Sequence, residues 1–334
     1  MTISQFRNEK SLFLANSPRL KQQKNFLLDI DCILSHFLHK DRTWILTHDD
    51  TNLEEIVDEK TLFQIEDALN LRSTGLPVAY ITGKKEFYGI DFFVNKNVLI
   101  PKPDTEILVE KALELIKENN FKTIADICTG SGCIGIAIAK NMQNREFGTE
   151  KISECNEQFF LTDVSHLALE VAQENAKTIL GENYVNGSQT NATETNAPHF
   201  SFLLGEFLWP LIENEDEKIR QTRFDIIVTN PPYIQRIMVN ELLRDGRNEP
   251  ILALDGDASY TNPIDENYGD GLSIIRPIVS QSFEKLKSGG FFLCETGEYN
   301  SSKTVGLCKI SGFSEIQVLN DLEGNPRVVM AKKI

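Results

Sequence analysis

A glycine-rich run near the middle of the chain has the composition of a cofactor-binding loop. It follows the apolar stretch Thr123 to Ile127 and leads into a helical pattern, and it consists of Cys128, Thr129, Gly130, Ser131 and Gly132. With Gly135, the glycines satisfy the G-x-G-x-x-G spacing between a strand and a helix. Glycine permits a tight turn and close backbone approach, and the helix N-terminus offers unpaired amides. The run therefore predicts a site for an anionic or polar group, such as a nucleoside-containing cofactor.

The next acidic candidate is Asp163, which ends an apolar strand pattern that begins near Phe159. A carboxylate at this position can accept both hydroxyls of a ribose, and this suits NAD and S-adenosylmethionine equally well. The alternative is that Asp163 caps the helix that begins at Ser165. We favour the ribose role because the glycine loop lies upstream.

The most specific signal is the segment Asn230-Pro231-Pro232-Tyr233, which directly follows the strand pattern of Phe224 to Val228. Because proline has no N–H, this loop presents acceptors, namely the side-chain oxygen of Asn230 and the carbonyl of Pro231. Two acceptors can hold both hydrogens of a planar NH2 group, against which Tyr233 can lay its ring. The alternative is an ordinary turn after a strand. Its place in the same sheet as the glycine loop favours a clamp for an amide or an exocyclic amine.

Strand and helix patterns alternate after Pro101, and this alternation predicts the elements that position these residues. The expected order is a helix from about Asp104, the strand at 123–127, a helix from Cys133, a strand near Phe159, a helix from Ser165 and the strand at 224–228. Such an order predicts an α/β fold with a mostly parallel sheet and helices on both faces. The last strand patterns, at 315–319 and 327–332, have little helix between them. We therefore expect the sheet to end in antiparallel strands.

The N-terminal 75 residues read as helical instead. Ser17-Pro18 resembles a cap followed by a first-turn proline, apolar residues recur at helical spacing from Leu20 to Phe37, and a later helix is expected to close at Gly75. In residues 76–101, aromatic and β-branched residues alternate around Gly89, which predicts a β-hairpin. The expected organisation is a helical substrate-docking domain at 1–75, a hairpin linker at 76–101 and a large α/β domain at 102–334. Polar stretches near 143–157, 183–198 and 259–268 read as inserted surface loops.

Composition narrows the class of protein. The 334 residues carry a net charge of -15, and an acidic chain repels the phosphate backbone of nucleic acids, so we expect no stable binding to DNA or RNA. The six cysteines are scattered without a C-x-x-C pair, which indicates free thiols and no metal site. The N-terminus does not read as a signal peptide and no apolar run is long enough to span a bilayer. We therefore expect a cytoplasmic protein that does not enter the membrane.

Several longer segments together carry a resemblance to a known family. They are PVAYITGKKEFYGIDFFVNKNVLIPKPDTEILVE, IADICTGSGCIGIAIA, FDIIVTNPPYI, EPILALDGD, DGLSIIRPIV and GGFFLCETGEY. Through these segments, from about Pro77 to the C-terminus, the chain resembles the release-factor glutamine N5-methyltransferase family. The resemblance implies a Rossmann-like class I methyltransferase fold with S-adenosyl-L-methionine as methyl donor and S-adenosyl-L-homocysteine as product. It also implies a substrate, the glutamine of the Gly-Gly-Gln motif in class I peptide-chain release factors, and hence a role in translation termination.

The resemblance assigns roles to particular positions. The family's cofactor-binding residues fall on Cys128, Thr129, Gly130, Ser131, Gly132, Asp163 and Asn230. Its substrate-binding and catalytic clamp falls on Asn230, Pro231, Pro232 and Tyr233. Phe207 is the best match for an aromatic residue that flanks the adenine, with Trp209 as competitor. No residue cluster indicates a metal or a covalent intermediate, so positioning is expected to supply most of the catalysis.

Two other classes of function share parts of this pattern. An adenine-N6 DNA methyltransferase uses the same four-residue clamp, but the acidic charge opposes a duplex partner and no basic patch accompanies the clamp. A binding module without catalysis on the same scaffold would be expected to lack Asn230 or a loop glycine, and both are present. The sequence therefore favours methylation of a protein amide.

Overall fold

The computed structural model describes the chain except for residues 22–24, 144–156, 182–184, 187–197, 245–247 and 259–268. The three predicted inserted loops fall mostly on these residues and so lie outside the described part. The chain divides into two compact units. Unit 1 comprises Met1–Lys84 with Asn240–Asn248, and unit 2 comprises Lys85–Val239 with Glu249–Ile334.

Unit 1 is built from short helices. They are α1 (Ile3–Ala15), α2 (Leu27–Leu38), α3 (Arg42–Thr47), α4 (Leu53–Ile56), α5 (Glu59–Ser73) and α6 (Val78–Thr82). The side chains of Thr2, Asp41 and Asp58 cap three of these helices by accepting backbone N–H groups. Their apolar faces share one buried cluster, which includes Phe6 and Ile33. The helical character predicted for the N-terminal region is confirmed.

The prediction that a helix begins at Ser17-Pro18 is wrong. Helix α1 has already ended at Ala15, and α2 begins only at Leu27. The Ser17 hydroxyl donates to the carbonyl of Ser73 at 2.6 Å and accepts from the backbone N–H of Arg19. Ser17 therefore joins a turn to the end of α5 instead of starting a helix. The expected end of that helix is confirmed, since Gly75 follows its last turn with a positive φ of 97°.

A two-stranded sheet follows unit 1 in the sequence. Strands β1 (Lys84–Phe87) and β2 (Ile90–Phe93) pair with each other, and the two residues between them, Tyr88 and Gly89, both have positive φ. Such a turn matches the twist of a hairpin. The predicted hairpin around Gly89 is thus confirmed, but the start of the predicted segment is wrong because α6 is helical.

Unit 2 contains an eight-stranded sheet. Its strands are β3 (Thr123–Ile127), β4 (Gln158–Asp163), β5 (Val185–Asn186), β6 (His199–Leu204), β7 (Phe224–Thr229), β8 (Leu286–Glu295), β9 (Ser314–Asn320) and β10 (Pro326–Lys332). The order across the sheet is β5-β6-β4-β3-β7-β8-β10-β9. The pairs from β5 to β8 are parallel, whereas β10 pairs antiparallel with both β8 and β9. The predicted sheet, parallel with an antiparallel end, is confirmed.

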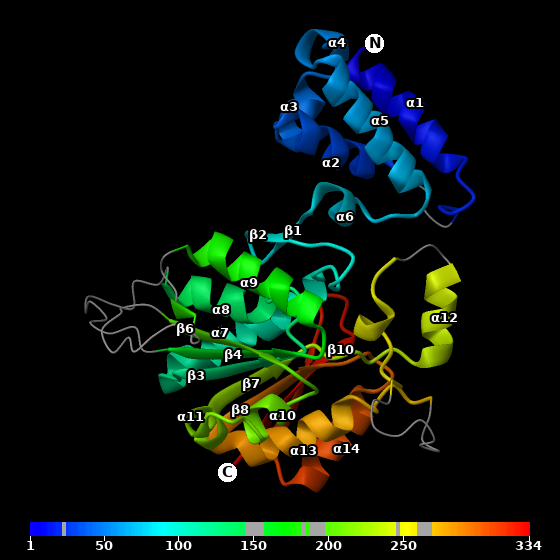
Figure 1. Cartoon of the computed structure of the whole chain (residues 1–334). Helices are drawn as coiled ribbons and strands as arrows, with labels where there is room; N and C mark the ends of the chain where they lie inside the picture. The colour runs from blue at the N-terminus through cyan, green and yellow to red at the C-terminus, as the bar shows by residue number, and fades with distance from the viewer. Residues whose placement is uncertain (22–24, 144–156, 182–184, 187–197, 245–247, 259–268) are drawn as a thin grey trace. The chain divides into compact units, whose positions relative to one another are not determined.

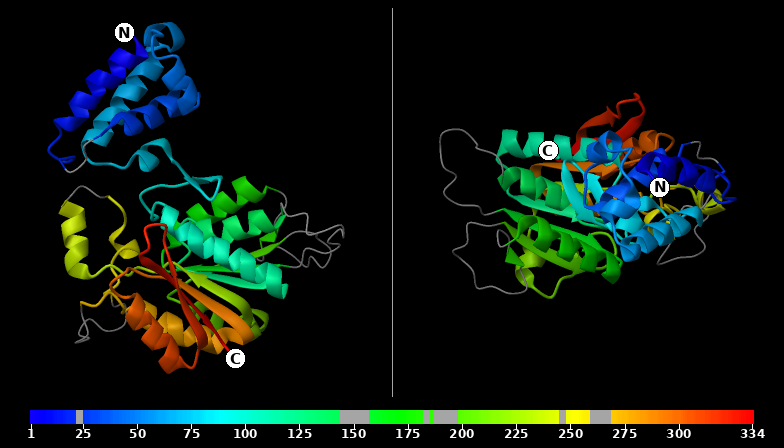
Figure 2. Two further views of the ribbon diagram at one scale, coloured as in Figure 1. Left: turned by 180° about the vertical axis from the view of Figure 1, so that it is seen from behind. Right: turned by 90° about the horizontal axis from the view of Figure 1, so that it is seen from above.

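Helices cover both faces of this sheet. On one face lie α7 (Glu106–Asn119), α8 (Cys133–Gln143) and α9 (His166–Leu180), and on the other lie α13 (Ile275–Lys285) and α14 (Ser301–Ser311) (Figures 1 and 2). Successive strand residues point to opposite faces, so Ile226 and Val228 join one buried cluster while Ile227 joins the other. Burial on both faces explains why these strands read as continuous apolar runs.

The remaining short elements lie between these. They are the 3-10 turns Pro103–Thr105 and Ile251–Ala253 and the helices α10 (Trp209–Ile212), α11 (Glu217–Gln221) and α12 (Arg236–Arg244). Several of them follow the carboxyl ends of strands, where the candidate site residues are found.

Candidate active site

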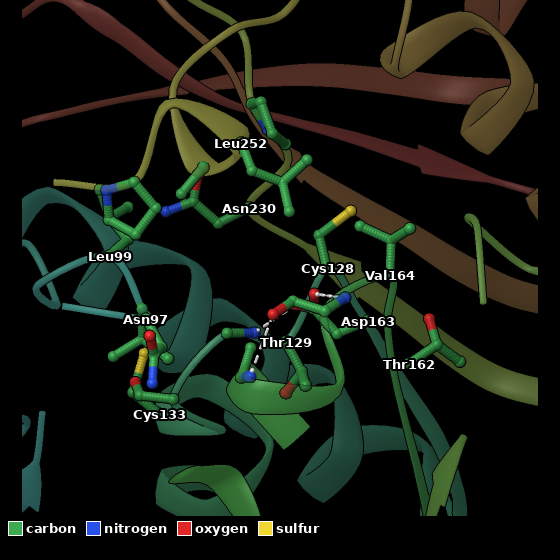
Figure 3. A pocket seen from close by; sticks show the side chains of 18 of the residues that line it. Asn97, Leu99, Cys128, Thr129, Cys133, Thr162, Asp163, Val164, Asn230 and Leu252 are labelled. Carbon is green, nitrogen blue, oxygen red and sulfur yellow. Dashed lines mark hydrogen bonds between the residues drawn. The ribbon is translucent and has the colours of Figure 1, made fainter. Parts of the chain in front are cut away.

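The carboxyl ends of four neighbouring strands contribute to one cavity in unit 2. The loops after β3, β4, β6 and β7 line it, together with parts of residues 97–101 and 250–253 (Figure 3). Its empty space is about 930 Å³ when the open solvent at its mouth is included. A cavity at this edge of the sheet is where open α/β folds bind ligands.

Most of the predicted site residues lie on the wall of this cavity. They are Cys128, Thr129, Gly130, Ser131, Asp163, Phe207, Asn230 and Pro232. The other three predicted residues, Gly132, Pro231 and Tyr233, are close in sequence but are not part of the lining. The structure thus brings together in space residues that are about 100 positions apart in the chain.

The glycine loop owes its shape to backbone that only small residues tolerate. Gly130 and Gly132 both have positive φ, at 56° and 78°. A Cβ on Gly132 would lie 2.6 Å from the Ile136 side chain and 3.1 Å from that of Ala172, so this position also requires glycine for close packing. Cys128 adopts a positive φ of 59° as well, which is uncommon for a residue with a side chain.

A buried carboxylate that sequence reasoning missed holds this loop. Asp126 Oδ2 accepts from the Thr129 hydroxyl at 2.6 Å and from the Gly135 N–H at 3.0 Å. A Cβ on Gly135 would lie 3.2 Å from the same oxygen, which explains the third glycine of the spacing. Burial raises the pKa of Asp126 to about 7, against the pull of its two hydrogen bonds. The only sequence signal was an acidic residue inside an otherwise apolar strand.

Asp163 joins the same loop to the next strand. Its Oδ2 accepts from the N–H of Gly130 at 2.9 Å, and its Oδ1 accepts from the N–H of Ser165 at 2.8 Å. The N-cap of α9 is Ser165, whose hydroxyl accepts from Ala168, so Asp163 does not occupy the cap position itself. Each carboxylate oxygen can accept more than one hydrogen bond, and Asp163 therefore keeps acceptor capacity toward the cavity. Burial raises its pKa.

The two aromatic candidates for the adenine are placed differently. Phe207 lines the cavity with a positive φ of 53°, and its carbonyl accepts from the Thr162 hydroxyl at 2.9 Å. Trp209 begins α10, is 43% exposed and is not part of the lining. This placement favours Phe207 over Trp209 as the ring beside a bound base.

The orientation of the Asn230 side chain is fixed by its neighbour. Its Nδ2 donates to the hydroxyl of Thr105 at 3.1 Å, which leaves Oδ1 as an acceptor. Among the described residues, no group donates to the carbonyl of Pro231. Figure 3 shows Asn230 and Asp163 around the same cavity.

Tyr233 is held through both its ring and its backbone. Its hydroxyl donates to Glu295 Oε1 at 3.0 Å, and its carbonyl accepts from Tyr299 at 3.1 Å and from Asn300 at 3.0 Å. A Cβ on Gly271 would collide with the Tyr233 carbonyl. The segments that contain Glu295, Tyr299 and Gly271 contribute to the resemblance, but the sequence analysis gave these three residues no role.

Metal-ligand groups and membrane-spanning helices are both absent from the part of the chain that the structure describes. No group of three His, Cys, Asp or Glu side chains in this part of the chain is placed to hold a metal ion. Nor does any helix in it have the length and apolar character needed to cross a membrane.

The order of the strands, their antiparallel end and the cavity at the carboxyl edge define a class I methyltransferase fold. Comparison with known proteins then narrows the class to a family. Residues 16–83 match the family model described as the PrmC N-terminal domain. The release factor glutamine methyltransferase of Clostridium acetobutylicum is 35% identical over 92% of this chain and 91% of its own, and that of Clostridium botulinum is 34% identical over 92% and 93%. The chain belongs to the release factor glutamine methyltransferase family.

The sequence identity to the following solved structure is lower than the identity to these two relatives. A ribosomal protein L11 methylase from Lactobacillus delbrueckii subsp. bulgaricus has 15% identity and a TM-score of 0.42 over 72% of this chain and 84% of its own.

Proposed function

We propose that this chain methylates the side-chain amide nitrogen, N5, of the glutamine in the Gly-Gly-Gln motif of class I peptide-chain release factors. S-Adenosyl-L-methionine is the methyl donor and S-adenosyl-L-homocysteine the product. The observation that carries the proposal is the orientation of Asn230, whose oxygen is left as an acceptor beside the cavity at the carboxyl ends of the strands. Membership of the family supports the same substrate, since its relatives are named for it.

The residues around the cavity fit S-adenosylmethionine. The glycines of the loop at 128–132 allow close approach of a ligand to the backbone, Asp163 offers acceptors for ribose hydroxyls, and Phe207 offers an aromatic face for a base. When bound there, this group supplies an electrophilic methyl on a positively charged sulfur. The task of the chain is to hold the glutamine amide in line with that methyl.

The clamp meets this task by accepting hydrogen bonds. An amide nitrogen is a weak nucleophile because its lone pair is delocalised. Asn230 Oδ1 and the Pro231 carbonyl can accept both hydrogens of the glutamine NH2, and this orients the nitrogen and favours the positive charge that develops on it. Because proline has no N–H, Pro231 and Pro232 add no donor that would compete with the glutamine NH2 for these acceptors. The clamp excludes a carboxylate side chain, which has no hydrogen to donate.

The charge of the chain agrees with a protein partner. A net charge of -15 opposes a nucleic-acid duplex, which an adenine-N6 DNA methyltransferase needs, and it favours a partner with a basic surface. We therefore expect a release factor, and not a nucleic acid, as the substrate.

The test compares two substrates that differ by one group. Purified protein and S-adenosylmethionine are incubated with a release factor that carries Gly-Gly-Gln or with its Gly-Gly-Glu variant, and peptides are analysed by mass spectrometry. We expect one added methyl on the glutamine and none on the glutamate. Methylation elsewhere in both factors at equal rates would contradict the clamp.

A further inference from the structure

Two segments that are distant in the chain form part of the cavity wall. Residues 97–101 and 250–253, the two wall segments, both contribute to the lining beside Asn230. Each places a leucine there, Leu99 and Leu252, and Figure 3 shows both leucines around the same cavity as Asn230. Leu252 is 38% exposed, so it lies where a substrate can cover it. Apolar side chains around a site exclude water and shape its entrance, so the spacing of the two wall segments matters for a substrate that reaches Asn230.

The second wall segment, 250–253, is fixed beside the clamp at its far end. The N–H of Ile234 donates to the carbonyl of Leu254 at 3.0 Å, and the N–H of Gly256 donates to the carbonyl of Ile234 at 2.9 Å. At its near end, the chain re-enters unit 2 at Glu249, after residues 240–248, which belong to unit 1. The start of this wall segment is therefore positioned in unit 2 by contacts of its own.

Glu249 supplies such a contact, and it reaches the first wall segment. Its side chain is only 4% exposed, and its Oε1 accepts from Lys102 Nζ at 2.6 Å and from the backbone N–H of Ile100 at 3.4 Å. Both donors lie at the end of the first wall segment. Burial of a carboxylate is unfavourable unless a positive group and hydrogen bonds compensate it, and Lys102 and Ile100 provide both. One carboxylate oxygen thus joins parts of the chain that are 147 residues apart.

The start of the first wall segment has a separate anchor, Asn175 on α9. This residue is 1% exposed, and its Oδ1 accepts from the N–H of Phe93 at 2.7 Å. Its Nδ2 donates to the carbonyl of Phe93 at 3.0 Å and to that of Ser131, in the glycine loop, at 2.9 Å. The hairpin end of the segment is therefore tied to the glycine loop, and its other end is tied to Glu249. Loss of the Glu249 contact should leave the glycine loop in place.

We propose that Glu249 and Lys102 are positioning residues, which hold the two wall segments together around the path of the substrate side chain to Asn230. Their effect falls on the protein substrate and not on S-adenosylmethionine, because the glycine loop is held independently. A displacement of about 1 Å in a site can cost about 100-fold in rate, so a modest separation of the two wall segments is enough to impair transfer. The inference rests on the proposed function for the identity of the substrate.

The experiment uses the full chain with Glu249→Ala, Lys102→Met and the double variant. We expect Glu249→Ala to lower kcat/KM for the release factor by about 10- to 100-fold, with the Kd of S-adenosylmethionine changed by less than about threefold. Lys102→Met should lower kcat/KM by about tenfold in the wild type and no further in Glu249→Ala, where its partner is already absent. Lys102→Arg keeps the positive charge and should stay within about threefold of the wild type. Additive losses in the double variant would contradict the pairing.

Glu157→Ala is the matched control. The side chain of Glu157 is 10% exposed and pairs with Lys122, which is 36% exposed, against 4% and 39% for Glu249 and Lys102. Glu157 directly precedes β4, so it lies at the strand ends opposite the cavity. The two alanine variants should lower the midpoint of thermal unfolding by similar amounts, while Glu157→Ala keeps kcat/KM within about twofold of the wild type. An equal loss of kcat/KM in both variants would show a general effect of destabilisation and overturn the positioning role.

Amide hydrogen exchange, followed by mass spectrometry without substrate, gives a readout that does not depend on activity. Peptides from the two wall segments should exchange faster in Glu249→Ala than in the wild type or in Glu157→Ala, whereas peptides that cover 128–132 should not change. Unchanged exchange in the two wall segments, or a wild-type kcat/KM in Glu249→Ala, would overturn the proposal. A wild-type protein that leaves the release factor unmethylated, together with the expected change in exchange, would contradict the proposed function and still support the anchoring by Glu249.

Discussion

The side chain of Asn230 is where the chemistry of this molecule is concentrated. Its single hydrogen bond in the described structure is to Thr105, so its removal leaves the surrounding strands in place. We predict that Asn230→Ala lowers kcat for release-factor methylation by about 10²- to 10³-fold, as does loss of one preorganised polar contact in other enzymes. The midpoint of thermal unfolding should stay within a few degrees of the wild-type value. Undiminished methylation by this variant would contradict the clamp.

Asp126 gives the stability of the folded chain a pH dependence. Its pKa is raised from 3.8 to about 7 in the folded chain because it is buried. A raised carboxyl pKa means that the folded state binds the proton more tightly than the unfolded chain, so the stability it contributes is present below pH 4 and is lost as the pH rises toward 7. Each pKa unit corresponds to about 1.4 kcal/mol.

The comparison with Asp126→Asn isolates this effect. Between pH 4 and 7.5, the free energy of unfolding of the wild type should fall by a few kcal/mol relative to that of the variant, which cannot titrate there. Urea unfolding at several pH values measures the difference. A difference that stays constant or increases with pH would show that Asp126 does not have a raised pKa.

The loops that follow β7 and β8 contact the clamp residue Tyr233. Gly271 has a φ of 71°, and a Cβ there would collide with the Tyr233 carbonyl. Gly324, in the hairpin between β9 and β10, has a φ of 89° but no heavy atom within 4 Å of such a Cβ. The two glycines thus share a left-handed backbone conformation, which a side chain would strain, and they differ in how crowded the space for a Cβ is.

We predict different outcomes for the two alanine variants. Gly324→Ala should lower the free energy of unfolding by about 1 to 2 kcal/mol, the cost of a left-handed residue, and leave kcat unchanged. Gly271→Ala should be more destabilising and should also lower kcat, because Tyr233 must move. Chemical denaturation and steady-state kinetics measure both quantities, and equal effects at the two positions would refute a supporting role for Gly271.

The elements also show which parts of the site a sequence can predict. The loop at 128–132 and Asn230 were predictable because each directly follows a strand whose apolar run marks it as buried, and parallel strands bring their ends together. Thr105 was not predictable, because its hydrogen bond to Asn230 joins two segments that are distant in the chain. Thr105 is 125 residues from its partner Asn230, and no local pattern marks such a pair. The turn at Ser17 was mispredicted for the same reason, since its partner is the distant carbonyl of Ser73.

At the scale of the whole molecule, the two units have separate hydrophobic clusters. Among the described residues, the cluster of unit 1 includes Phe6 and Ile33, and no residue of the two clusters of unit 2 belongs to unit 1. The residues of the candidate site all lie in unit 2. We propose that the helical N-terminal region docks the protein substrate and that unit 2 performs the transfer.

This division predicts how a shortened chain behaves. A chain that begins at residue 85 should still methylate a short Gly-Gly-Gln peptide at a rate within about tenfold of the full chain, while it loses most activity toward the intact release factor. The physical reason is that docking lowers the entropy cost of bringing the loop to the clamp. Circular dichroism establishes that the shortened chain is folded. Equal losses on both substrates would argue against a docking role.

The most direct measurement offers the full chain both substrates that its clamp could accept. The protein is incubated with S-adenosylmethionine and either a class I release factor or an oligonucleotide that contains adenine, and each product is analysed by mass spectrometry. We predict one methyl group on the glutamine of the Gly-Gly-Gln motif and an unchanged oligonucleotide. Methylation of the oligonucleotide alone would contradict the account.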